Sequence, residues 1–129
     1  MPQARRKPGA EALGKAAVLS KALVRAAAQL DLPQAKLARI LGVSAATMSR
    51  IYSGSYSLSP EKKEWEFAVL LVRLFRSLDA IVGGMTEDAR LWLTSENRAL
   101  ADQKPLDLIT TTEGLVRVVN YLDARRAVV

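Results

Sequence analysis

The sequence contains neither cysteine nor histidine among its 129 residues. Without cysteine the chain can form no disulfide and no thiolate metal site, which fits the reducing cytoplasm. Without histidine it lacks the commonest general base at neutral pH and any Ser-His or Cys-His nucleophile pair. We therefore expect no catalytic residue, no metal site and no cofactor, and we predict that the protein is not an enzyme.

Glycine and proline are also few, and the hydrophobic residues are chiefly Ala, Leu and Val. Such a composition favours helices over sheets, so we predict an all-α fold. The longest apolar run, 67–72, is far shorter than the roughly 18 residues of a membrane-spanning segment. The basic start of the chain is not followed by the hydrophobic stretch of a secretion signal. We expect a cytoplasmic protein that makes no membrane contact.

The net charge of +6 is concentrated in the first half of the chain. Residues 1–60 hold nine basic and two acidic side chains, whereas residues 61–129 hold ten basic and eleven acidic ones. A polyanion such as DNA is the natural partner of the basic half. Alternatively, Arg5, Arg6 and Lys7 only aid solubility, because residues 1–10 show no hydrophobic period and are expected to form a flexible basic tail.

Hydrophobic periodicity and capping residues predict the helices. A first helix is expected over 11–30, a second from Pro33 to Gly42, and a third capped by Ser44 and ending near 52. A long helix is predicted over 60–82, opened by Ser59 and Pro60. Further expected elements are a helix capped by Thr86 and ending near 95, a single turn over 105–109, and a final helix capped within 110–112.

Residues 34–54 have the spacing of two short helices packed near right angles. Ala38 supplies the small residue where the helices approach, and Gly42 supplies the turn. This segment resembles the helix-turn-helix of Xre/Cro-type regulators, although a generic helical hairpin is the alternative. The resemblance implies that the second helix enters the major groove of operator DNA. The predicted DNA-binding residues are Gln34, Lys36, Ser44, Ala45, Ala46, Thr47, Ser49 and Arg50, with Tyr52 and Ser53 as further phosphate contacts.

The predicted helix over 60–82 is apolar on several sides. A chain of this length offers few elements to cover it, so we expect it to form the central core and part of a homodimer contact. The alternative is a core formed entirely within one chain. Gly114, near the start of the last helix, suggests that another chain segment approaches closely there.

Residues 89–118 contain, in order, Trp-Leu, Asn and Ala-Leu, Pro-Leu-Asp-Leu, and Glu-Gly. This order resembles the C-terminal domain of the MbcA/ParS/Xre antitoxin family. Together with the helix-turn-helix, it makes the chain similar to Xre antitoxins encoded beside RES-domain toxins. The resemblance implies a dimeric type II antitoxin that binds a toxin acting on NAD, covers its active site and represses its own operon. Asp102 and Gln103, where many relatives have glycine, and the lack of a late glycine depart from the pattern.

The implied organisation is a tail over 1–10, a DNA-binding domain over 11–59, a central helix over 60–84 and a toxin-binding domain over 85–129. The end of the chain, 118–129, is expected to lie nearest the toxin's catalytic pocket, although it could equally fray in solvent. A stand-alone dimeric repressor without a toxin partner is the alternative function. The predicted toxin-binding residues are Trp92, Asn97, Arg98, Asp123, Arg125, Arg126 and Val129.

Overall fold

The computed structural model describes residues 10–128, and these residues form helices with no strand, which confirms the all-α prediction. The basic tail expected over 1–10 lies outside the described residues except for Ala10, and Val129 also lies outside them. The helices are α1 (Ala10–Gln29), α2 (Gln34–Leu41), α3 (Ala45–Ser53), α4 (Lys63–Ile81), α5 (Thr86–Thr94), the 3-10 helix η1 (Arg98–Leu100), α6 (Pro105–Leu108) and α7 (Thr112–Val128).

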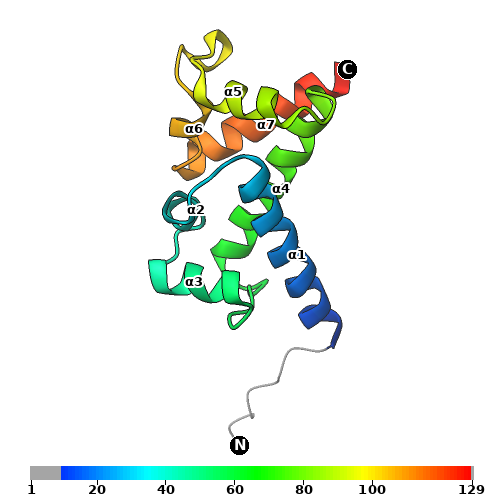
Figure 1. Cartoon of the computed structure of the whole chain (residues 1–129), viewed down its shortest axis with the longest axis vertical. Coiled ribbons are helices and arrows are strands. Elements are labelled where there is room, and N and C mark those ends of the chain that lie inside the picture. Colours follow the sequence, from blue (N-terminus) through cyan, green and yellow to red (C-terminus); the bar gives the residue numbers. More distant parts are fainter. Residues whose placement is uncertain (1–9, 129) are drawn as a thin grey trace, which may run out of the picture.

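The long helix α4 joins the two halves of the molecule (Figure 1). Helices α1 and α2 pack on it from the N-terminal half, and α5 and α7 pack on it from the C-terminal half. Buried side chains from both halves form one continuous hydrophobic cluster, which extends from Leu23 to Leu122. The two halves therefore share one core, with α4 at its centre.

Helix α4 begins later than the sequence indicated. Ser59 and Pro60 form a turn in which the Lys62 amide donates to the Ser59 carbonyl at 3.1 Å, and the helix starts only at Lys63. The expected cap at Ser59 is therefore wrong. The end of the helix is as expected, because Gly83 and Gly84 have φ values of +63° and +79°, a left-handed conformation that glycine adopts without steric cost.

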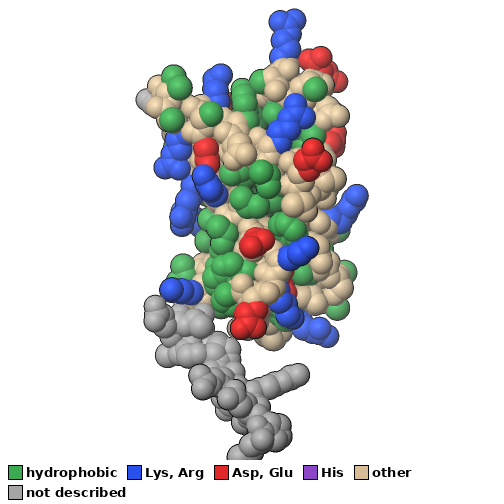
Figure 2. Space-filling view, turned by 180° about the vertical axis from the view of Figure 1, so that it is seen from behind, with side chains coloured by type: hydrophobic (Ala, Val, Ile, Leu, Met, Phe, Trp, Pro, Cys, Tyr) green, Lys and Arg blue, Asp and Glu red, His purple; other side chains and the backbone are tan. Residues whose placement is uncertain are grey.

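Most of α4 is covered by the rest of the chain. Leu71, Leu74 and Leu78 are completely buried, so most of its apolar surface serves an intramolecular core. A narrow strip remains, with Val69 42% exposed and Trp65 half-buried. Exposed hydrophobic side chains also form a band along the middle of the face shown in Figure 2.

Side chains of α5 form hydrogen bonds with the end of α1. The guanidinium of Arg90 donates to the carbonyl oxygens of Gln29 and Ala28 in the last turn of α1 at 3.0 and 3.2 Å, and the Ala28 carbonyl also accepts from the Asp31 amide. Thr86 is not the helix cap that the sequence suggested, because its hydroxyl donates to the Gln29 side chain at 3.2 Å and Met85 holds the cap position. These contacts join the two halves at a second place besides α4.

No helix among residues 10–128 is long and apolar enough to cross a membrane.

Candidate functional sites

The turn between α2 and α3 has the geometry that the sequence predicted. Gly42 ends α2 with φ +72°, and its backbone allows the chain to reverse. Ser44 caps α3, because its side-chain oxygen accepts from the Thr47 amide at 3.0 Å and its hydroxyl donates to the Thr47 hydroxyl at 3.0 Å. Leu37, Leu41 and Met48 are fully buried beneath the turn. Helices α2 and α3 are thus held as a helix-turn-helix unit.

The outward face of α3 is composed of small and polar side chains. Ala45, Ala46, Ser49 and Arg50 are exposed, as the sequence predicted for a surface that meets DNA. Arg50 is the only charged side chain of the helix. The exposed face of α3 thus carries one donor-rich cation and the methyl groups of two alanines.

The other predicted DNA-binding residues differ in exposure, and two of them already form contacts within the chain. Thr47 is half-buried and its hydroxyl contacts Ser44, so both side chains partly serve to form the cap. Gln34 and Lys36 lie in the first turn of α2, where Gln34 is exposed and Lys36 is half-buried. All four residues lie on the helix-turn-helix unit. Ser44 and Thr47 form the cap of α3, whereas Gln34 and Lys36 take no part in it.

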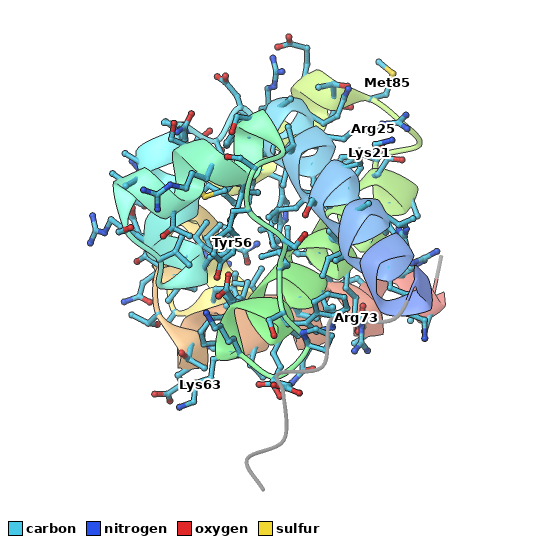
Figure 3. All side chains as sticks on the ribbon, turned by 90° about the horizontal axis from the view of Figure 1, so that it is seen from below. Lys21, Arg25, Tyr56, Lys63, Arg73 and Met85 are labelled. Carbon is cyan, nitrogen blue, oxygen red and sulfur yellow. The ribbon has the colours of Figure 1, made fainter. Side chains whose placement is uncertain are left out.

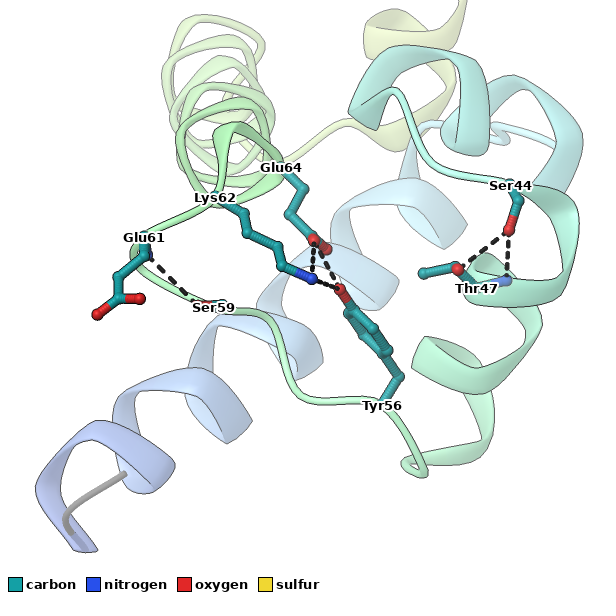
Figure 4. A network of polar contacts seen from close by, with 7 residues as sticks. All are labelled: Ser44, Thr47, Tyr56, Ser59, Glu61, Lys62 and Glu64. Carbon is teal, nitrogen blue, oxygen red and sulfur yellow. Dashed lines mark hydrogen bonds and ion pairs between the residues drawn. The ribbon is translucent and has the colours of Figure 1, made fainter. Parts of the chain in front are cut away.

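A polar network that sequence reasoning missed holds the loop after α3 (Figure 4). The hydroxyl of Tyr56 donates to the carboxylate of Glu64 at 2.6 Å, and the Lys62 ammonium lies 3.4 Å from the Tyr56 hydroxyl and 4.0 Å from the same carboxylate oxygen. Glu64 is buried in the first turn of α4, where a negative charge also suits the positive end of the helix dipole. The sequence offered little signal for this network, because Glu64 is one of two carboxylates in the first turn of α4 and nothing local distinguishes it from Glu66.

The two tyrosines around the end of α3 have shifted acidities. The hydrogen bond to Glu64, followed by burial, raises the pKa of Tyr56. Burial raises the pKa of Tyr52. Both hydroxyls therefore keep their protons throughout the neutral range, and that of Tyr56 donates to Glu64.

In the C-terminal half, the side chain of Trp92 packs against the last helix. Its ring stacks on that of Tyr121 with centroids 6.2 Å apart and planes inclined by 9°, which joins α5 to α7. Gly114 confirms the predicted close approach, because a Cβ atom there would lie 1.9 Å from the carbonyl oxygen of Leu108. The Thr111 hydroxyl oxygen accepts from the Gly114 amide at 3.1 Å and so caps α7.

Asn97 organises the loop that carries Arg98. Its side-chain oxygen accepts from the Ala99 amide at 2.9 Å, and its own backbone pairs with Gln103 across the loop. Ala101 and Asp102 both have positive φ, +58° and +61°. Of the two residues at which the family resemblance led us to expect glycine, Asp102 therefore holds a backbone conformation that glycine adopts more easily, whereas Gln103 does not.

Asp123 is already paired within the chain. Its carboxylate forms an ion pair with Arg73 and accepts from the Ser77 hydroxyl at 2.8 Å, both on α4. The carboxylate predicted to bind the toxin is thus held by α4 within the chain, and its role toward a toxin stays a prediction. Arg125 and Arg126 are exposed in the last turn of α7, Val128 is 87% exposed, and Val129 lies outside the described residues.

No group of three or more Asp and Glu side chains among the described residues is placed to hold a metal ion.

Comparisons with known proteins identify both halves. Residues 9–73 match the family model of the antitoxin Xre-like helix-turn-helix domain, and residues 77–127 match that of the antitoxin Xre/MbcA/ParS C-terminal toxin-binding domain. The fold is similar to a chain of the crystal structure of the M. tuberculosis MbcT–MbcA toxin–antitoxin complex, with a TM-score of 0.64 and 25% identity. That match covers 87% of this chain and 96% of the other. Among curated proteins none matches.

The two family matches meet inside α4, between residues 73 and 77, so the helix at the centre of the shared core also joins the two matched domains. A toxin-binding domain implies a toxin as partner, and the prediction that the protein is not an enzyme is confirmed. The chain therefore belongs to the antitoxins that combine an Xre-like helix-turn-helix domain with an Xre/MbcA/ParS C-terminal toxin-binding domain.

Proposed function

We propose that this antitoxin inhibits a RES-domain toxin that consumes NAD, binds it through residues 85–129, and represses its own operon as a homodimer. The observation that carries the proposal is the joining of an exposed recognition helix, α3, and a toxin-binding domain through the single helix α4. One protein with both surfaces can sense the toxin and control its synthesis.

The end of α7 is the proposed blocking element. Arg125 and Arg126 are exposed one turn beyond Asp123, whose ion pair with Arg73 fixes the direction in which the helix leaves the core. In the complex we place Arg125, Arg126 and Val129 nearest the catalytic pocket, with Trp92, Asn97 and Arg98 on the supporting surface. A carboxylate from Val129, or from Asp123 if it exchanges partners, would pair with toxin arginines that otherwise bind NAD phosphates.

The proposed dimer contact is the uncovered strip of α4. Val69 and Trp65 lie in an open groove of about 700 Å³ between α1 and α4, together with Val18 and Leu19 of α1. Burial of an apolar strip of this kind stabilises a symmetric interface. A dimer also presents two copies of α3 to paired DNA half-sites.

Co-expression tests the toxin assignment. The chain is produced together with the reading frame encoded beside it, which the proposal expects to be a RES-type toxin, and growth and pull-down are measured. We expect the toxin alone to stop growth and lower cellular NAD, and the pair to grow and to purify as a complex. Normal growth with the toxin alone, or toxicity that the antitoxin does not relieve, would show that the partner is not this enzyme and would favour a stand-alone repressor.

A further inference from the structure

A groove lies where the end of α3 meets α1, outside the residues predicted to contact DNA from α2 and the start of α3. Its volume is about 500 Å³, and it is lined by α1, the last turn of α3 and the loop that follows. Ser20, Tyr52, Ser53 and Ser57 are among its lining residues, and the Ser53 hydroxyl also donates to the Arg50 carbonyl at 3.1 Å. Among the described residues, the only charged side chains in its lining are Lys21 and Arg25 of α1, and none of these residues contributes a carboxylate.

The two cations are available to a partner. Lys21 and Arg25 are exposed, lie one helical turn apart on α1, and form no ion pair within the described residues (Figure 3). They also border a second hollow whose remaining charged residue is Arg76, so their surroundings are positive on both sides. Cations with no acidic partner and with neighbouring hydroxyl donors are the usual chemistry of phosphate binding.

We propose that Lys21 and Arg25 bind phosphates of the DNA backbone beside the end of the recognition helix, on the strand that Gln34 and Lys36 of α2 do not reach. This inference rests on the proposed DNA binding and extends it to α1. A helix inserted into the major groove is flanked by the phosphates of both strands, because the groove is only about 12 Å wide.

The structure supplies donors on both flanks. Helix α2 lies on one side of α3, whereas α3 ends against α1 on the other (Figure 1). The Tyr56–Glu64 network holds the intervening loop against α4, so Ser53 and Tyr52 keep their places at the edge of the groove. Contacts of this kind add affinity that is independent of base sequence, and each neutralised phosphate adds to the salt dependence.

Because phosphate contacts are independent of sequence, a random-sequence DNA duplex of about two helical turns serves as the probe. Binding of the full chain and of the K21A/R25A variant is measured by fluorescence anisotropy at several salt concentrations. We expect the slope of log K against log salt to become less steep by about 1 to 2 in the variant, since each lost phosphate contact contributes about 0.9. Circular dichroism verifies that the helices remain.

The K104A/R117A variant is the matched control, because it removes two exposed cations from the C-terminal half. It should leave the slope unchanged. An unchanged slope in K21A/R25A, or an equal change in the control, would overturn the inference, the second result because net charge alone would explain it. If the parent chain binds no duplex at any salt concentration, the proposed repressor function fails, and the inference fails with it.

Discussion

Arg50 is the side chain on which the proposed DNA recognition most depends, because it is the only charged side chain of α3. Its neighbours Ala45 and Ala46 offer only methyl groups, which can contact thymine but accept or donate no hydrogen bond. A guanidinium placed at a base edge discriminates by about 1–3 kcal/mol, whereas one placed on a phosphate adds affinity without discrimination.

We therefore expect Arg50→Ala to weaken binding to a duplex from the chain's own upstream region by about 1–3 kcal/mol. Anisotropy titrations with this duplex and with a scrambled duplex separate the two roles. If the variant no longer binds the upstream duplex more tightly than the scrambled duplex, Arg50 contacts a base. If its affinity for both duplexes falls equally, Arg50 contacts a phosphate. Arg39→Ala, which removes an exposed cation from the end of α2, is the control. Binding by Arg50→Ala equal to that of the parent at every salt concentration would disprove the role.

Ala101 holds a backbone conformation that costs an alanine energy. Its φ is +58°, and a residue with a Cβ atom pays roughly 1–2 kcal/mol to adopt this region. Ala101→Gly should raise the free energy of unfolding by about 0.5–1 kcal/mol, after allowance for the greater freedom of glycine in the unfolded chain. Urea unfolding measures the change. Ala99→Gly, at an exposed helical position of η1, should instead be neutral or destabilising.

The loop between α3 and α4 depends on a protonated tyrosine. Because Tyr56 has a higher pKa in the folded chain than in the unfolded chain, its contribution to stability is complete below the ordinary tyrosine pKa of 10.0 and is lost as pH rises through the folded value. Tyr56→Phe should lower stability at pH 7 by about 1.5 kcal/mol, since it leaves a buried carboxylate oxygen without its donor.

Urea unfolding at pH 7 and above pH 10 tests this loop. The parent should lose more stability over this interval than Tyr56→Phe does. Tyr121→Phe, at a tyrosine outside the loop that stacks on Trp92, should retain the alkaline sensitivity of the parent. Equal pH dependence of the parent and Tyr56→Phe would contradict the assignment.

The C-terminal end of α7 is proposed to block the toxin, and truncation tests this directly. Deletion of 124–129 leaves Asp123 and its contacts with Arg73 and Ser77, so α7 keeps its anchor on α4. We expect the shortened chain to retain its helical circular dichroism but to lose protection in the growth assay with the toxin. Full protection by the shortened chain would move the contact to the surface around 92–108.

Features set by local backbone geometry could be predicted from the sequence, whereas those set by tertiary packing could not. The cap at Ser44, the reversal at Gly42 and the close approach at Gly114 were predictable, because each is set by local backbone geometry. The start of α4 was not, since Ser59 and Pro60 also suit a simple turn and the tertiary fit of α4 decided between the two. The Asp123–Arg73 pair depends on how α7 crosses α4, which no local pattern encodes.

At the scale of the whole molecule, the groove between α1 and α4 is the surface that we expect a second chain to cover. Its centre is apolar, with Val69 42% exposed, but Arg76 and Arg126 also line it, beside Arg73, whose charge is offset by its ion pair with Asp123. In a symmetric dimer the apolar strips attract and the like-charged rims repel. The balance gives a characteristic salt dependence, because salt screens the repulsion and strengthens apolar burial.

We expect light scattering to give a dimer mass at tens of micromolar protein, and we expect the dimer to become tighter as salt is raised, opposite to DNA binding. Val69→Lys places a cation in each apolar strip and should weaken dimerisation by about tenfold or more, which corresponds to at least about 1.4 kcal/mol. Leu91→Lys is the matched control, because Leu91 is 65% exposed on α5 outside the groove. It should leave the dimer intact. A monomer mass for the parent at every salt concentration, or an undiminished dimer in Val69→Lys, would exclude this strip as the contact between two chains.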